Sequence, residues 1–561
     1  MRRKTWLLLV ASLVAVLALG AAGCGGDDDD DDAAGGDTGA ATDGGQPAAE
    51  QVMTIGWGAD PPSLDPGIAE DTTSAHLLSN LFDPLVKLNP DTLEAEPALA
   101  ESWDIEGPLV TFHLREDGTW TNGDPVTAGD FEYAWKRALD PELAGSYSYQ
   151  LGGIKGAAEY NSCEGAQCTA LRDQVAVTAV DDFTLEVELT SEQPWFIQQV
   201  AHHVFLPVHQ ATVEEFGAQW PEPGNIVTNG PFMLESFEHE ANINLVKNPD
   251  WRDADSVSLE RIDGRIIIDG VTRVQAFEAG EVDALDGGGL PPEEIERLKT
   301  EPYFEQYPSL GTYYYGFNTK NISDLNERRA LSLAINRKII TDNIDRTGRD
   351  QATGMTPKGM PGFDVINPES PWLPPEGDIE QAKELYAQVA NPHQQINLFH
   401  NDAPGHKEIA VAVQDQWSEL GVQTTIKAQE WAQFLEFLGP PPNDEVDVYR
   451  LGWIYDFPDA LNGLEVFICD DPPGSTNNST NWCEPEYDAL IEEARATPDE
   501  AARWEIYAQI EDLMFGEDGA LPITPIMWYT FPNLENDAVR DTLFINPLDS
   551  IDFTKVVVQE G

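Results

Sequence analysis

Three histidines lie close together in the segment HHVFLPVH, at His202, His203 and His209. Imidazole nitrogens are common zinc ligands, but this spacing is not that of HExxH, which places two histidines one helical turn apart. His239-Glu240 begins such a motif, yet position 243 is Ile, so the second ligand is missing. We therefore interpret these histidines as structural and predict no metal site.

Other catalytic patterns are also missing from the sequence. No GxxxxGK[ST] phosphate-binding loop occurs, and the nearest approach to a GxSxG nucleophile elbow, YPSLG at 307–311, lacks the first Gly. The 99 acidic residues do not single out a carboxylate pair at glycosidase spacing. The sequence therefore predicts no catalytic residue and no cofactor, with a secreted hydrolase as a minor alternative.

Four cysteines lie in two turn-rich segments, NSCEGAQC with Cys163 and Cys168, and ICDDPPGSTNNSTNWC with Cys469 and Cys483. An even number of such cysteines is typical of proteins from oxidising compartments. Bonds within each segment are the simplest of the three possible pairings. Zinc is the alternative, but neither segment has CxxC spacing or a nearby His. We predict disulfides.

The N-terminal residues have the layout of an export signal. A basic start at 2–4 (RRK) precedes an apolar run at 6–19, which is too short for a comfortable membrane span. Cys24 follows Ala-Ala-Gly and resembles the acylated Cys of a bacterial lipobox, although Ala21 stands where that motif usually has Leu. The alternative is an ordinary signal peptide that is cleaved nearby.

We accordingly expect residues 1–23 to be a lipoprotein signal peptide and Cys24 to be the lipid anchor. Residues 24–51 are expected to form a disordered acidic tether, because they combine Gly, Ala, Thr and Asp, including six consecutive Asp, with almost no apolar residue able to pack.

The charge balance excludes some partners. In 561 residues, 99 Asp and Glu against 32 Lys and Arg give a net charge of −67, which argues against nucleic acid because phosphate contacts need clustered basic residues. A hydrophobic content of 41% with 15 Trp provides a large core and excludes a wholly disordered chain. The acidity is compatible with tolerance of high salt concentrations or with attraction of cationic ligands.

Local patterns predict a mixed chain. Leu109–Arg115 and Thr184–Leu189 alternate with the period of strands. Thr127 followed by Asp130 predicts a helix start, and 327–340 and 501–513 have helical spacing. These patterns indicate a large α/β or α+β protein with two or more lobes.

Eight sequence blocks together resemble the family 5 extracellular solute-binding proteins, the peptide- and nickel-binding receptors of ABC importers. In chain order the blocks are PPSLDP (61–66), ALAESWDIEGPLVTFHLREDGTWTNGDPVTAGDFEYAWKRALDP (98–141), NGPFMLESF (229–237), FEAGEVDAL (277–285), YYYGFNTKNISDLNERRALSLAINR (313–337), LGWIYDFPDA (451–460), EPEYDALIEEA (484–494) and LPITPIMWYT (521–530).

The resemblance implies a two-lobed periplasmic-binding-protein-like fold with a hinge, a ligand cleft between the lobes and an extra domain. By this likeness we place lobe 1 at 52–83, 173–308 and 520–561, the extra domain at 84–172, and lobe 2 at 309–519. Such a receptor performs no chemistry, and the ligand stabilises the closed form by touching both lobes.

The LGWIYDFPDA block resembles the oligopeptide-binding branch of the family. That likeness implies that Asp456 pairs with the terminal ammonium of a peptide, and that Arg450 lies near its carboxylate. Gly452 and Trp453 would line the cleft. The alternatives are that Asp456 caps a helix starting near Pro458, that Arg450 forms an internal ion pair, and that Trp453 belongs to the core.

Glu70 and Thr72 stand at offsets that match a family segment which pairs with the ligand backbone. Tyr313 and Tyr315 would share one face of a strand, with Tyr314 on the other face, and aromatic residues in such a strand are more often core than ligand contacts.

The expected partners are an oligopeptide, a membrane permease with its ATPase subunits, and the membrane through the lipid anchor, with the receptor a monomer on the extracytoplasmic face. Oligosaccharides, opines, haem and metal chelates are the other solutes of the family, so a non-peptide ligand is the main alternative. A third possibility is a purely structural surface lipoprotein that binds no solute.

Overall fold

The computed structural model describes residues 46–287, 289–367, 372–402, 405–439, 441–469 and 478–560, all within one compact unit. The predicted signal peptide, Cys24 and the tether up to residue 45 lie outside the described residues. A search of the described helices found none with the length and apolar character that a membrane span requires.

The first five-stranded sheet has the order β11-β1-β10-β9-β8. Its strands are β1 (Val52–Trp57), β8 (Phe232–Glu238), β9 (Asn242–Lys247), β10 (Arg261–Ile266) and β11 (Ala284–Leu285). β1 runs parallel to both of its neighbours, and β8, β9 and β10 are antiparallel. Met53, Ile55 and Trp57 alternate along β1 and are fully buried, so this sheet forms the core of lobe 1.

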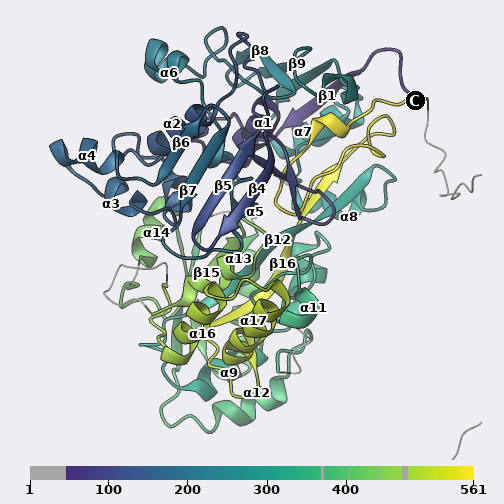
Figure 1. Ribbon diagram of the computed structural model, residues 1–561. Coiled ribbons are helices and arrows are strands. Elements are labelled where there is room, and N and C mark those ends of the chain that lie inside the picture. Colours follow the sequence, from purple (N-terminus) through teal and green to yellow (C-terminus); the bar gives the residue numbers. More distant parts are fainter. Residues whose placement is uncertain are drawn as a thin grey trace, which may run out of the picture. The chain divides into compact units, whose positions relative to one another are not determined.

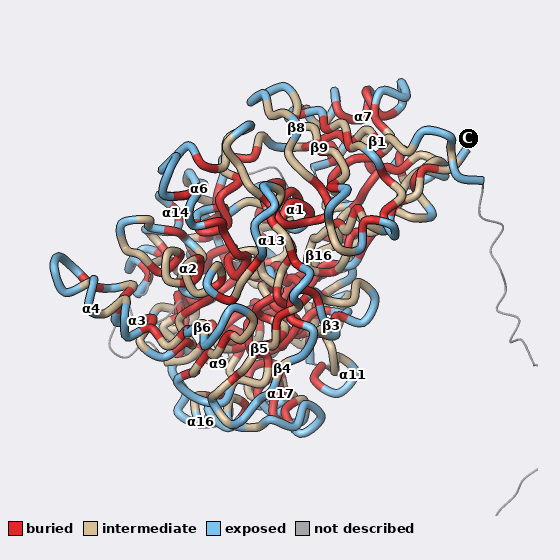
Figure 2. Tube along the Cα trace, turned by 45° about the horizontal axis from the view of Figure 1, so that its top comes forward, coloured by how far each residue is buried: buried red, intermediate tan, exposed pale blue. Residues whose placement is uncertain are grey.

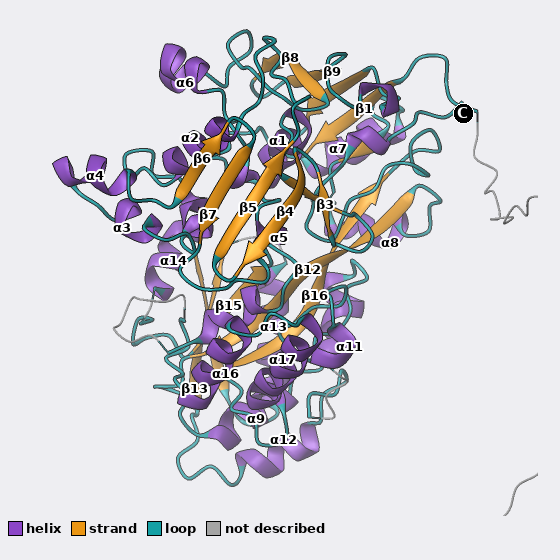
Figure 3. Cartoon of the chain, viewed as in Figure 1, coloured by secondary structure: helices purple, strands orange, loops and turns teal. Residues whose placement is uncertain are grey.

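The chain between β1 and β8 forms a four-stranded antiparallel sheet in the order β4-β5-β7-β6. It comprises β4 (Ala100–Glu106), β5 (Leu109–Leu114), β6 (Val177–Asp181) and β7 (Thr184–Glu188), and Figure 3 shows the strands side by side. Both predicted strands are confirmed. The short pair β2 (Val86–Leu88) and β3 (Ala95–Pro97) precedes this sheet.

Helix α2 (Ala128–Ala138) contacts β6 and β7 and confirms the predicted helix start. Asp130 accepts a hydrogen bond from the Thr127 backbone N–H at 2.8 Å, which completes a capping box. The buried face of α2 carries Phe131 and Trp135, and the Trp135 Nε1–H donates to the Phe205 carbonyl at 2.7 Å.

The second five-stranded sheet has the order β14-β13-β15-β12-β16 and forms the core of lobe 2. Its strands are β12 (Phe304–Phe317), β13 (Gln395–Asn401), β14 (Gln423–Gln429), β15 (Val448–Ile454) and β16 (Ile523–Leu534). β13 is parallel to β14 and β15, whereas β12 is antiparallel to β15 and β16. Tyr313 and Tyr315 pack in one buried cluster and Tyr314 in another, as the alternation predicts.

The long strands β12 and β16 connect the two lobes (Figure 1). Phe304 pairs with Leu534 beside the lobe 1 clusters, whereas Tyr313 pairs with Met527 in the core of lobe 2. An isolated bridge from Glu535 to Ala284 continues the connection to β11.

Helices cover the sheets, and Figure 2 shows buried residues concentrated along the strands with exposed residues on α4 and α16. The helices other than α2 are α1 (Thr72–Leu81), α3 (Ala157–Asn161), α4 (Cys168–Arg172), α5 (Phe196–Gln199), α6 (Gln210–Phe216), α7 (Gly270–Glu278), α8 (Pro292–Leu298), α9 (Leu325–Leu333), α10 (Arg337–Ile339), α11 (Phe363–Ile366), α12 (Ile379–Tyr386), α13 (His406–Ser418), α14 (Trp431–Leu438), α15 (Leu461–Leu464), α16 (Pro485–Arg495) and α17 (Glu500–Phe515).

The predicted helix at 501–513 lies within α17, but the one predicted at 327–340 is wrong as a continuous element. The chain leaves the helix after α9, and Asn336 then caps α10 by accepting a hydrogen bond from the Ile339 N–H at 2.9 Å. Both predicted disulfides, Cys163–Cys168 and Cys469–Cys483, are present.

Candidate ligand-binding site

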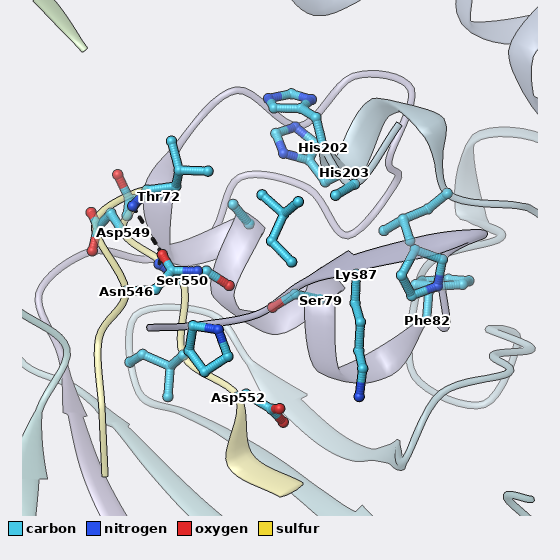
Figure 4. Close-up of a pocket in the computed structure, with 18 of the residues that line it drawn as sticks. Thr72, Ser79, Phe82, Lys87, His202, His203, Asn546, Asp549, Ser550 and Asp552 are labelled. Carbon is cyan, nitrogen blue, oxygen red and sulfur yellow. Dashed lines mark hydrogen bonds between the residues drawn. The ribbon is translucent and has the colours of Figure 1, made fainter. Parts of the chain in front are cut away.

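A cavity of about 490 Å³ lies between residues of lobe 1 and the end of β15 in lobe 2. Its walls come from α1, the segments around Tyr147 and His202, the turn after β15, and the C-terminal segment that includes Asn546–Asp552. Figure 4 shows the parts contributed by α1, by His202 and His203, and by the C-terminal segment. The volume is in the range of sites that hold small organic ligands.

Helix α1 presents one face to this cavity. Asp71 caps the helix by accepting a hydrogen bond from the Ser74 N–H at 2.9 Å. Thr72, Ala75, Ser79 and Phe82 line the cavity, and their spacing of three and four residues places them on the same side of the helix. The opposite face, with Leu77 and others, is buried in the core of lobe 1.

Asp456 lies in the wall, directly beyond the end of β15. Its Oδ2 accepts hydrogen bonds from the Tyr149 hydroxyl at 2.9 Å and the Asn462 amide at 3.2 Å. Burial raises the pKa of Asp456 above its ordinary value. Asp456 does not cap the following helix, because the Leu461 N–H donates to Asp459 instead.

Two further predicted site residues, Glu70 and Thr72, also line the cavity. The Ser146 hydroxyl donates a hydrogen bond to Glu70, so this carboxylate is tied to the segment that precedes Tyr147. The structure therefore brings Glu70, Thr72 and Asp456 to one cavity from positions almost 400 residues apart in the chain.

The other three predicted residues lie behind the wall. The Arg450 guanidinium is buried, donates to Asn401 at 3.1 Å and to the Tyr529 hydroxyl at 2.8 Å, and stacks 4.4 Å from the centre of the Tyr313 ring. Gly452 lies against the Tyr529 hydroxyl, which is 2.3 Å from the position of a β-carbon. A larger residue at 452 would displace that hydroxyl.

Trp453 lies on the face of β15 opposite to that of Arg450 and Gly452, as expected from strand alternation. It packs against the core of lobe 2, and its Nε1–H donates to Asn462 Oδ1 at 3.0 Å. The same Oδ1 accepts a hydrogen bond from the Asp456 N–H at 3.0 Å. Asn462 thus connects Trp453 with the carboxylate in the cavity wall.

Sequence reasoning did not place two of the histidines at the cavity. His202 and His203 line the cavity, whereas His209 lies against Trp120 and 3.1 Å from Asp124 Oδ2. The described part of the chain holds no group of three or more His, Cys, Asp or Glu arranged for a metal ion. The three histidines drew attention to this segment of the sequence, but their spacing did not indicate that two of the side chains line a cavity.

A cavity between two α/β lobes, with two long strands running from one lobe to the other, is the arrangement of a hinged solute-binding protein. Residues 94–474, more than half of the chain, match the bacterial extracellular solute-binding proteins, family 5 Middle, and the chain belongs to this family.

Relatives cover nearly the whole chain. The chain is 33% identical over 559 residues to the oligopeptide-binding protein OppA of Bacillus subtilis, covering 96% of this chain and 97% of that protein. It is 33% identical over 515 residues to the periplasmic oligopeptide-binding protein OppA of Escherichia coli, covering 90% and 92%. A relative at 30% identity, covering 90% and 93%, is named a probable deoxycholate-binding periplasmic protein, YgiS, also of Escherichia coli.

Two solved structures share the fold. The unliganded open form of the murein tripeptide-binding protein MppA superposes with a TM-score of 0.77 at 28% identity, covering 93% of this chain and 99% of that one. Haemophilus influenzae OppA in complex with the peptide RPPGFSPFR gives a TM-score of 0.72 at 27% identity, covering 92% and 100%.

Proposed function

We propose that this protein is the peptide-binding receptor of an ABC importer and holds its ligand between the two lobes. The relatives named oligopeptide-binding, which cover nearly the whole chain, support the peptide as ligand. Closure would occur about β12 and β16, and a ligand that touches both lobes would stabilise the closed form.

The observation that carries this proposal is the unpaired carboxylate of Asp456. Among the described residues its side-chain partners are the uncharged Tyr149, Asn462 and Gln150, and it forms no ion pair with Lys or Arg. A buried carboxylate gains most from a positive partner, and the terminal ammonium of a peptide supplies one with hydrogen-bond donors. Glu70 and Thr72 would contact the ligand from lobe 1, while Arg450, Gly452 and Trp453 would hold the wall in place.

Delivery would require attachment near the permease. Acylation at Cys24 and the acidic tether would keep the receptor on the extracytoplasmic face of the membrane, which raises its effective concentration at the permease. The receptor would act as a monomer, and the ATPase subunits of the transporter would supply the energy.

The domain assignment is part of this proposal. β6 and β7 pair with β5 in one sheet, and the predicted boundary at residue 172 falls inside that sheet. β16 pairs with β12 in the second sheet, so the predicted boundary at residue 520 also cuts off a strand of lobe 2. We therefore propose that the extra domain extends to about residue 189, that lobe 2 spans about residues 309–530, and that the remaining described residues belong to lobe 1.

Isothermal titration calorimetry with Ala-Ala-Ala and N-acetyl-Ala-Ala-Ala tests the role of Asp456. Acetylation removes the ammonium, and loss of one partner of a buried charge pair costs about 2–5 kcal/mol, so we expect the Kd to rise at least about 30-fold. Asp456→Asn should weaken binding of Ala-Ala-Ala and abolish most of the difference between the two ligands. Glu493→Gln, an exposed acid on α16, is the charge-matched control.

Equal binding of the two peptides would contradict the role of Asp456 but leave a peptide receptor. If neither peptide binds, and native mass spectrometry of the purified protein shows a non-peptide ligand such as a bile acid or a sugar, the peptide itself is contradicted. Conversion of the ligand to a product would contradict a receptor altogether.

A further inference from the structure

Three rings form one continuous surface along the cavity. The centre of the Tyr147 ring lies 4.6 Å from that of His202 and 5.2 Å from that of His203, and the two imidazoles are 4.1 Å apart. All three side chains line the cavity, and Figure 4 shows the two imidazoles next to each other. We call Tyr147, His202 and His203 the aromatic wall.

The imidazoles of the aromatic wall are fixed by hydrogen bonds to the backbone. His203 Nε2 donates to the Ala69 carbonyl at 3.0 Å, and His202 Nδ1 accepts from the Val204 N–H at 3.3 Å. Burial lowers the pKa of both histidines, that of His202 strongly. The wall is therefore uncharged at neutral pH and does not repel a cation.

Carboxylates surround this uncharged wall. Burial and then the nearby charges of Asp456, Glu70 and Asp71 raise the pKa of Tyr147 to about 12. Within the described residues, none of these three carboxylates forms an ion pair with Lys, Arg or His, in contrast to many other acids of the protein. An aromatic face bordered by unpaired carboxylates attracts a cation both through the ring and through the charges.

We propose that the aromatic wall and Glu70 form a subsite for a cationic side chain, so that the receptor selects peptides whose first residue is Lys or Arg. Tyr149 donates its hydroxyl hydrogen to Asp456, and its ring lies 5.9 Å from that of Tyr147. Asp456 and the wall are therefore neighbours, as the ammonium and the side chain of one residue would be. This subsite rests on the proposed function, because it lies in the same cavity.

The subsite is tested by calorimetry with Lys-Ala-Ala, norleucine-Ala-Ala, Glu-Ala-Ala and Phe-Ala-Ala on the purified receptor. Norleucine keeps the alkyl chain of Lys without its charge. We expect Lys-Ala-Ala to bind about tenfold more tightly than the norleucine peptide, and Glu-Ala-Ala to bind most weakly. The preference for Lys should shrink as salt is raised.

Glu70→Gln should reduce the ratio of the Lys and norleucine affinities to about two or less, whatever its effect on the affinity for norleucine-Ala-Ala itself. Glu70 is exposed, so folding is not at risk, and thermal unfolding of the variant should match that of the native protein. Tyr147→Leu should reduce the same ratio. Glu493→Gln is the control for net charge and should preserve the ratio.

Equal affinities for the Lys, norleucine and Glu peptides would overturn the subsite and leave the peptide receptor intact. Tighter binding of Phe-Ala-Ala than of Lys-Ala-Ala would overturn it too, because the wall would then select aromatic side chains by stacking. Failure of all four peptides to bind would overturn both the subsite and the peptide function.

Discussion

Replacing Glu535 by Gln should make the protein more stable at alkaline pH. Glu535 follows β16 at the connection between the lobes and is 0% exposed. Its Oε1 accepts hydrogen bonds from the Tyr307 hydroxyl and from the Asn533 amide, both at 2.8 Å, while Oε2 has no hydrogen-bond partner among the described residues. Gln keeps the accepting oxygen and places its amide where Oε2 was.

The magnitude follows from the pKa of this carboxyl. Burial raises the pKa of Glu535 from its ordinary value of 4.5 to about 7. Below pH 4.5 the group is protonated in both the folded and the unfolded chain, so its protonation does not reduce the free energy of unfolding. As pH rises through 7 this free energy falls, because the unfolded chain releases the proton first, and the full loss corresponds to about 3 kcal/mol.

Urea unfolding at pH 5 and pH 8 measures this effect as the difference in unfolding free energy between Glu535→Gln and the native protein. We expect the difference to shift in favour of the variant by about 2–3 kcal/mol between the two pH values. Glu511, whose pKa burial also raises to about 7, is present in both proteins and cancels. Glu106→Gln, at an exposed position, controls for net charge. A difference that does not change with pH would refute the reasoning.

Two further changes test the packing of lobe 2. Replacing Cys469 and Cys483 by Ser should lower the free energy of unfolding by about 3 kcal/mol, because the bond closes a loop with a sequence separation of 14. Reductant should then lower the thermal unfolding temperature of the native protein more than that of the variant, which keeps only the Cys163–Cys168 bond. Asp459→Asn should lower the free energy of unfolding by about 3–5 kcal/mol, since Asp459 Oδ2 accepts a hydrogen bond from Arg503 Nη2 at 2.9 Å and both side chains are buried. Urea unfolding measures this loss. An unchanged free energy of unfolding, or no recovery of stability when Arg503→Met is added, would contradict this.

The sequence predicted those parts of the fold that depend on neighbouring residues. Leu109–Arg115 and Thr184–Leu189 alternate because one face of each strand is buried, and Thr127 with Asp130 forms a cap from residues three apart. The break between α9 and α10 was missed because the apolar spacing continues through it, whereas the local bond of Asn336 ends the helix.

The candidate site residues came from the resemblance to the family, and membership of a well-matched block did not decide which of them line the cavity. Asp456, Glu70 and Thr72 do line the cavity, but Arg450, Gly452 and Trp453 lie behind its wall, and which side of β15 faces the ligand depends on how the lobes pack. The segment Asn546–Asp552 is irregular and carries no periodic pattern, so nothing local indicated that it lines the cavity.

The two ends of the described chain meet in lobe 1. The Ala48 N–H donates to the Val558 carbonyl at 2.8 Å, and Pro47 bridges to Gln559. A fluorophore attached near residue 48 or residue 558 therefore reports the position of lobe 1, and a second one at Glu493 reports that of lobe 2. The chain enters lobe 2 along β12 and leaves it along β16, so closure would rotate lobe 2 about these two strands. Energy transfer between the two dyes would then measure the change in distance between the lobes when ligand binds.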